Sequence, residues 1–414
     1  MQKLYIILFL IAVNNFAISA QNKASQYKKK NIMKEIRENL KSDNYQRVND
    51  IAYNAVTNYE EAKNDAEFYD ILVNAQENLA LAENKKMYLK SKADTAKYFN
   101  HIYNMYVYAI KCDSIETNLN AQEDTKKAKY KYRNKNSDKL NLFRNNLLNA
   151  GKFHYKKKQY DKAYLFFNAY IESSEQPLVT KHIVDKIIED SIIKSSALLS
   201  VLSAHASNNH KGVVKHLHVA LEDTSTKAVI VEMGSKSYAA LGDTLNMLRL
   251  LDYGMKNYPK YEYFYSVLIK YYNEKGKFNE SLEIVKNATD SNPENRNCWF
   301  IRGKVEEYLN MPDSALISYK KAVEVKPDDA ESYSCLGGIY LNKAHEAYSK
   351  FNGTVGTKEY IDEKKNIDDI YNTARINFEA SKKLAPENKS LWLSSLKDIY
   401  FKLSMGKELI QLDE

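Results

Sequence analysis

A regular spacing of prolines is the sequence feature that most constrains the fold of this chain. Pro259, Pro293 and Pro327 lie 34 residues apart, and they are three of only six prolines in 414 residues. Other positions keep the same interval, among them Gly242 and Gly276, Gly303 and Gly337, and the aromatic series Tyr265, Trp299 and Tyr333. A fixed period of this length predicts stacked copies of one supersecondary unit.

The composition restricts the kind of unit. Glycine is as scarce as proline, with 12 residues in 414. A β-sandwich needs a turn signal in every short segment, and a doubly wound α/β fold needs glycine-rich turns, so both classes are disfavoured. Cysteine is limited to Cys112, Cys298 and Cys335, an odd number that excludes a disulfide-stapled class. We therefore predict an all-α fold in which Cys298 and Cys335 remain buried thiols.

Within the period, the residues resemble tetratricopeptide repeats. Segment 328–341 matches best, with Tyr333, Leu336, Gly337 and Tyr340 in the expected places of a first repeat helix. The preceding unit supplies Trp299, Gly303, Ala315, Tyr319, Ala322 and Pro327, but Arg302 and Glu306 replace an expected Leu and Tyr. The resemblance covers about 228–392 and implies a right-handed superhelical solenoid of antiparallel helix pairs.

The interval also divides the chain into regions. We expect a signal peptide at 1–20, divergent helical pairs at 21–227, clear repeats at 228–386 and a C-terminal capping helix with a short tail at 387–414. Pro386 follows Pro327 by 59 residues, which is one period and 25 more, so we expect an insertion at about 345–370. This insertion separates the two helices of the last full repeat. Gly353 and Gly356 within it favour a flexible tip, either functional or disordered.

Residues 1–20 have the three regions of a secretory signal peptide: Lys3, an apolar run from Leu4 to Val13, and a polar stretch ending in Ala20. The run is too short to span a bilayer, so cleavage after Ala20 is preferred over an uncleaved anchor. No cysteine follows that would accept a lipid. We expect an exported, most simply periplasmic protein that is neither a lipoprotein nor embedded in a membrane.

No catalytic or cofactor motif is present, so we predict no enzyme activity and no cofactor. Four histidines lie between 205 and 218, but their spacing is not that of a metal site. The densest basic run, 126–139, interleaves Lys and Arg with Tyr130 and Tyr132. Export argues against nucleic acid as its ligand. A solvated face is the main interpretation, and an anionic lipid, glycan or protein patch is the alternative.

The candidate site is a stripe on the first helices of the clear repeats, which in the resembled family lines the concave groove. Three lysines of this stripe keep the 34-residue interval, although three lysines can also align by chance. They could bind an acidic segment or a C-terminal carboxylate. We predict a scaffold that binds a protein or peptide here; carbohydrate or envelope binding and self-assembly are the alternatives. The candidate residues, called the inner stripe below, are Lys236, Tyr263, Lys270, Asn273, Asn297, Phe300, Lys304 and Glu307.

Overall fold

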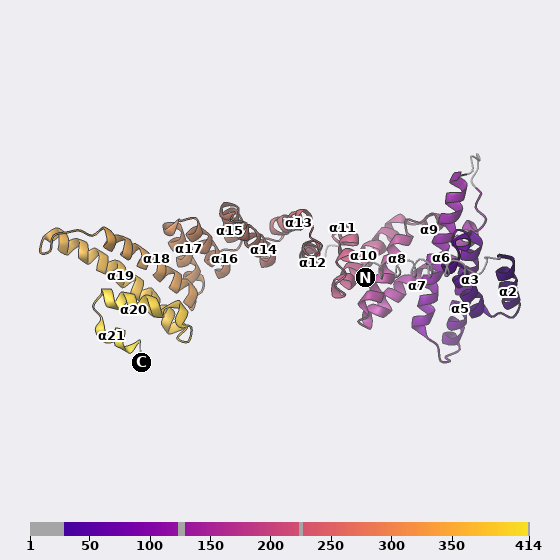
Figure 1. The fold of residues 1–414 in the computed structure, drawn as a ribbon, viewed down its shortest axis with the longest axis horizontal. Helices are drawn as coiled ribbons and strands as arrows, with labels where there is room; N and C mark the ends of the chain where they lie inside the picture. Colours follow the sequence, from indigo (N-terminus) through magenta and orange to yellow (C-terminus); the bar gives the residue numbers. More distant parts are fainter. Residues whose placement is uncertain (1–28, 123–128, 223–226, 413–414) are drawn as a thin grey trace, which may run out of the picture. The chain divides into compact units, whose positions relative to one another are not determined.

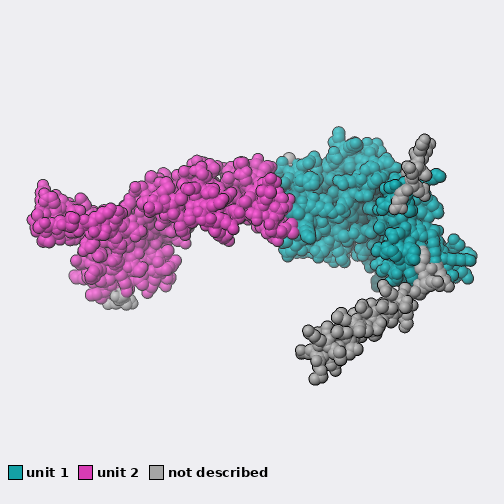
Figure 2. Space-filling model, turned by 45° about the horizontal axis from the view of Figure 1, so that its top comes forward, with its two compact units in different colours: residues 1–230 teal, residues 231–414 magenta. Residues whose placement is uncertain are grey.

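The computed structural model describes residues 29–122, 129–222 and 227–412, so the signal peptide predicted at 1–20 lies outside the described residues. Within these ranges every regular element is a helix, which confirms the predicted all-α class (Figure 1). The chain divides into two compact units, residues 1–230 and 231–414 (Figure 2). The handedness of the superhelix stays a prediction.

Unit 1 is built from antiparallel helical pairs. Its helices are α2 (Lys29–Lys41), α3 (Tyr45–Asn58), α4 (Glu60–Lys63), α5 (Ala66–Tyr88), α6 (Thr95–Gln122), α7 (Arg133–Lys156), α8 (Tyr160–Ser173), α9 (Pro177–Thr180), α10 (Lys186–Ala206) and α11 (His210–Ala220). Its core is aromatic: the rings of Phe99 and Phe166 lie 6.4 Å apart between α6 and α8, and Tyr106 donates its hydroxyl to the Leu140 carbonyl at 2.6 Å.

Unit 2 contains the helices of the regular repeats. These are α12 (Lys227–Ala240), which begins just before the division, α13 (Thr244–Asn257), α14 (Glu262–Glu274), α15 (Phe278–Ser291), α16 (Arg296–Tyr308), α17 (Pro312–Val325), α18 (Ala330–Lys350), α19 (Lys358–Leu384), the 3-10 turn η1 (Lys389–Leu391), α20 (Leu393–Lys402) and α21 (Gly406–Gln411). The C-terminal region thus carries two helices after Trp392, where the sequence predicts one.

The prolines of the 34-residue interval occupy equivalent corners. Pro259, Pro293, Pro327 and Pro386 each lie two residues after a helix end, in the same two-residue turn. The residue before each proline lies outside the helical region, with φ between −133° and −142° and ψ between 59° and 91°. Proline disfavours helical backbone at the preceding residue, so it stops the second helix at a fixed place.

A glycine at a fixed position of the hairpin brings its two helices close. A Cβ on Gly303 would lie 2.6 Å from the Tyr319 ring, and one on Gly337 would lie 2.7 Å from the Phe378 ring. In unit 1, Gly151 faces Phe167 at 2.5 Å, and this pair has the same 16-residue separation as Gly303 and Tyr319. The α7–α8 hairpin is therefore built like the regular repeats, although the sequence pattern fades there.

The 25-residue insertion is mostly helical. It lengthens α18 and α19 of one hairpin, and only a short tip at 351–357 lies outside both helices (Figure 1). At the tip the Phe351 and Tyr360 rings lie 4.9 Å apart, and Gly356 has φ +91°, which glycine adopts readily. The insertion is therefore an extension of the hairpin with a short tip, and the flexibility expected of that tip stays a prediction.

Candidate functional site

The inner stripe lies on the first helices α12, α14 and α16, one turn from residues that pack in the core. On α14, the buried Phe264, Tyr265, Leu268 and Ile269 alternate with Tyr263, Lys270 and Asn273 of the stripe. Helical spacing explains this division, because residues three or four apart share a face. The apolar face fixes the rotation of each helix and thereby the direction of the stripe.

At the α12 end, Lys236 and Tyr263 come together. The Lys236 ammonium lies 5.0 Å from the centre of the Tyr263 ring and forms an ion pair with Glu232 on its own helix. The hydroxyls of Tyr263 and Ser235 lie 3.1 Å apart, and burial raises the pKa of Tyr263. This group joins α12 to α14 and leaves the Lys236 side chain about half exposed.

At the α16 end, Phe300, Lys304 and Glu307 form a second group. The Lys304 ammonium lies 3.6 Å from a Glu307 carboxylate oxygen and 5.8 Å from the centre of the Phe300 ring. Tyr319 of α17 donates its hydroxyl to Glu307, and burial raises the Tyr319 pKa. Burial opposes the charge of Lys304, but the neighbouring Cys335 and Glu307 outweigh it and raise the Lys304 pKa.

Lys270 and Asn273 lie between these groups on α14, and within the described ranges no hydrogen bond or ion pair joins them to either group. The Lys270 side chain is 77% exposed, and its ammonium lies 3.9 Å from Glu274 of the same helix. The side-chain oxygen of Asn273 is buried and accepts no hydrogen bond from any described residue. A buried acceptor without a donor is unfavourable unless a partner supplies one.

Asn297 connects α16 to the first residue of α14. Its amide donates to a Glu262 oxygen at 3.2 Å, and it lines a 510 Å³ cavity with Arg296 at the Pro293 corner. Glu307 lines a separate 220 Å³ cavity between α16 and α18. Arg296 also pairs with Asp329, whose side chain does not cap α18, whereas the Asn295 side chain caps α16 at 2.9 Å.

Sequence reasoning missed one further member of the lysine column. Lys397 on α20 follows Lys304 by two periods and the 25-residue insertion, the same interval that relates Trp299 to Trp392. The two tryptophans are equivalent in the structure: each indole donates to the carbonyl at or next to its corner proline, at 2.8 Å for Trp299 and 3.1 Å for Trp392. Carrying the insertion through the lysine column would therefore have identified Lys397.

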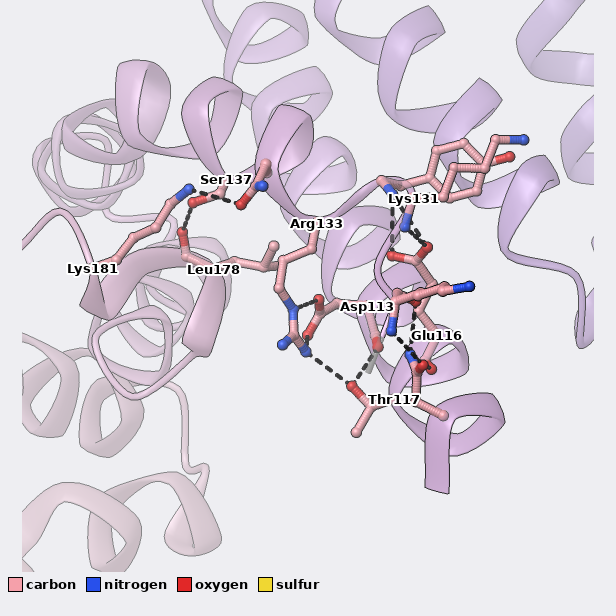
Figure 3. A network of polar contacts seen from close by, with 12 residues as sticks. Asp113, Glu116, Thr117, Lys131, Arg133, Ser137, Leu178 and Lys181 are labelled. Atoms are coloured by element: carbon pink, nitrogen blue, oxygen red, sulfur yellow. Dashed lines mark hydrogen bonds and ion pairs between the residues drawn. The ribbon is translucent and has the colours of Figure 1, made fainter. Parts of the chain in front are cut away.

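Three of the five cations in the described part of the basic run, residues 129–139, pair with carboxylates of the chain; residues 126–128 lie outside the described ranges. Arg133 forms two hydrogen bonds with Asp113, at 2.5 and 2.8 Å, and stacks on the Tyr130 ring at 3.3 Å (Figure 3). Glu116 accepts the backbone amide of Lys131 at 2.6 Å. Lys135 and Lys139 pair with carboxylates of α5. This run therefore fastens α7 to α5 and α6.

The three cysteines carry free thiols, with Cys298 buried and Cys335 only partly so. Burial raises the pKa of both thiols. Across the described ranges no three histidine, cysteine or acidic side chains converge in a way that could hold a metal ion. None of the described helices is both long enough and apolar enough to cross a membrane.

Comparison with known proteins gives similarity in structure only. No protein-family model and no curated protein sequence matches the chain. The crystal structure of MamA is 13% identical, covers 48% of this chain and 93% of its own, and has a TM-score of 0.33. YrrB, described as a TPR protein with an unusual peptide-binding site, is 17% identical over 47% of this chain and 91% of its own, with a TM-score of 0.34.

The C-terminal part of a TPR repeat-containing protein from Cytophaga hutchinsonii is 12% identical over 64% of this chain and 98% of its own, with a TM-score of 0.36. Identities and TM-scores this low carry no functional argument. The fold class rests on the chain itself: helical pairs that recur every 34 residues with proline at each corner and glycine at each close approach.

Proposed function

We propose that this chain, which is built from helical repeats of the tetratricopeptide type, is a non-catalytic scaffold that binds an extended protein segment along the inner stripe. The observation that carries the proposal is the orphan oxygen of Asn273, buried one turn from the exposed Lys270. An amide N–H of a bound segment would satisfy this oxygen, while a carboxylate of the same segment would reach Lys270.

The carboxylates beside the three lysines favour binding of an acidic partner at Lys270 over binding at Lys236 or Lys304. Lys236, Lys270 and Lys304 each face a carboxylate of their own helix, Glu232, Glu274 and Glu307 respectively. Exposed pairs of this kind contribute at most about 1 kcal/mol each, so a partner carboxylate can replace them. Lys270 has the longest of the three separations, at 3.9 Å, and is the expected anchor.

The sequence pattern of the N-terminal residues supports the same function outside the cytoplasm. Residues 1–20 have the pattern of a signal peptide, and we propose that the scaffold acts in the periplasm on an envelope protein. A scaffold of this kind needs neither a cofactor nor nucleic acid.

The test is a crosslinking pull-down from envelope extract, followed by titration of a synthetic peptide taken from the crosslinked segment of the partner. Changing Lys270 and Lys304 to Glu should weaken peptide binding by tenfold or more, and Asn273→Ala should weaken it without changing its salt dependence. Lys286→Glu with Lys321→Glu, on the second helices α15 and α17 of the same repeats, changes the net charge equally and should leave binding intact. Undiminished binding by the Lys270 and Lys304 variant would refute the proposal.

A further inference from the structure

A strongly basic surface lies in unit 1, where the turn between α5 and α6 meets the C-terminal end of α7. These segments enclose a 560 Å³ cavity whose lining includes Lys86, Lys92, Lys97, Lys157 and Phe153. The Phe153 ring of α7 lies 5.5 Å from the Phe99 ring of α6 and holds the two helices together. Lysines that are distant in the sequence therefore share one surface, and the inner stripe contributes nothing to it.

Carboxylates in the described part of the chain compensate little of the charge of this surface. Segments 83–97 and 152–158 contain five and four lysines, against Glu83 and Asp94 as the only carboxylates. Within the described ranges the only ion pair among these residues joins Lys86 to Glu83 at 2.6 Å. Glu83 also accepts the Asp94 amide at 3.0 Å, and Asp94 in turn caps α6 by accepting the Lys97 amide at 3.0 Å.

Both carboxylates are thus engaged by groups of the chain itself, and the remaining lysines of these segments form no ion pair with any described residue. The hydrogen bond from Lys86 and, to a smaller extent, the hydrogen bond from the Asp94 amide lower the pKa of Glu83. Glu83 therefore stays ionised near neutral pH, and its negative charge is already paired with Lys86. The N-terminus of the long helix α6 lies at the same cavity and adds to the positive potential.

Two large apolar side chains project from the same turn. Tyr88 is 86% exposed and Leu89 is 62% exposed, with Lys85, Lys86 and Lys90 on either side in the sequence. A soluble anion would need only the lysines. An exposed aromatic and an aliphatic residue surrounded by lysines are typical of protein surfaces that enter the headgroup region of a membrane.

We propose that this end of unit 1 docks on an anionic lipid surface, with lipid phosphates against the lysines of the cavity and Tyr88 and Leu89 inserted among the headgroups. Attraction to anionic lipid is about fivefold in affinity for each lysine near the surface. The basic run at 129–139 has less free charge to offer, because Asp113, Asp70 and Glu77 pair with Arg133, Lys135 and Lys139.

The experiment is co-sedimentation of the full chain with vesicles of pure phosphatidylcholine or with 30% phosphatidylglycerol, at low and high salt. The apolar run near the N-terminus is common to all variants, so the measured quantity is the difference between the two vesicle types. We expect binding to the anionic vesicles that falls as salt increases. Changing Lys92, Lys97 and Lys157 to Glu should reduce it by at least about a hundredfold, and changing Tyr88 and Leu89 to Ser about tenfold.

The matched control changes Lys358, Lys365 and Lys383 of α19 to Glu, which alters the net charge equally and should leave binding intact. All of the substituted lysines are exposed, and circular dichroism checks that each variant folds. Equal losses in both triple variants, no preference for phosphatidylglycerol, or full inhibition by inorganic phosphate would overturn the proposal. The inner stripe takes no part in this assay, so its failure would leave the peptide-binding proposal standing.

Discussion

Two adjacent glycines in α18 have opposite surroundings. A Cβ on Gly337 would lie 2.7 Å from the Phe378 ring of α19, whereas a Cβ on Gly338 would meet nothing within 4 Å. Gly337→Ala should therefore lower the free energy of unfolding by about 1–3 kcal/mol, because the hairpin must separate or the ring must leave its rotamer. Gly338→Ala should raise it by about 0.5–1 kcal/mol, because alanine favours a helix interior.

Urea denaturation followed by tryptophan fluorescence measures both changes, because Trp299 and Trp392 lie in unit 2. Each variant serves as the control for the other, since the two substitutions are chemically identical and one residue apart. Equal effects in the two variants would show that the α18–α19 contact does not depend on the glycine.

Two residues that depart from the repeat pattern form an interaction that the pattern could not predict. Arg302 and Glu306 replace an expected Leu and Tyr, which taken one at a time predicts a weakened helix pair. In the structure Arg302 donates to Glu306 at 3.0 Å, and Ser318 donates to the same buried carboxylate at 2.6 Å. Arg302 and Glu306 thus compensate each other by forming a hydrogen bond. A repeat pattern that treats each position separately cannot detect such an interaction.

At the scale of elements, residues 129–132 before α7 are held by carboxylate hydrogen bonds as well as by the packing of Tyr132 on the core. Glu116 accepts the Lys131 amide at 2.6 Å and the Tyr132 amide at 3.2 Å (Figure 3). Glu116→Ala should expose these amides to exchange and raise their hydrogen-exchange rates by about 10- to 100-fold, since hydrogen bonds to a charged group contribute about 1.5–3 kcal/mol.

The control for this prediction is Asp138→Ala, because Asp138 lies on the following helix and its side chain is 71% exposed. It should leave the exchange of the Lys131 and Tyr132 amides unchanged. Unaltered protection of these amides in the Glu116 variant would mean that another contact holds the segment.

Helix boundaries could be predicted where a segment recurs at the 34-residue interval, and not where a segment occurs only once in the chain. The corners follow from Pro259, Pro293 and Pro327, because proline acts on its own neighbour. The helical extension at 345–370 could not be predicted, since nothing upstream provides a second copy for comparison. For the candidate site, the repeat gives the register of Lys236, Lys270 and Lys304. It does not give their partners Glu232, Glu274 and Glu307, because these stand at three different positions of the repeat.

At the scale of the whole molecule, histidine is distributed unequally between the units. Seven of the eight histidines lie in residues 1–230, and His345 is the only one in residues 231–414. His101, His154 and His216 are buried in unit 1, and burial lowers the pKa of all three, to about 4 for His216. Acidification should therefore act on one unit and spare the other.

The direction in which pH changes the stability of unit 1 follows from comparison with the unfolded chain, in which the pKa of histidine is about 6.5. A histidine whose pKa is lower in the folded state stabilises the fold above pH 6.5 and loses that contribution as the pH falls toward the folded pKa. For His216 alone, the loss between pH 7 and pH 5 is about 2 kcal/mol. We expect the urea transition of unit 1, followed by far-ultraviolet circular dichroism, to move to lower urea, while the tryptophan transition of unit 2 stays in place.

The His216→Gln variant isolates the cause. Glutamine cannot be protonated in this range, yet its amide can still donate to the side-chain oxygen of Asn168, which lies 2.8 Å from His216 Nε2. The unit 1 transition of this variant should depend less on pH than that of the unaltered chain, whereas His345→Gln in unit 2 should leave the unit 1 transition unchanged. If the tryptophan transition instead moved with acid, the two units would unfold as one, and the unequal distribution of histidine would have no separate effect on unit 1.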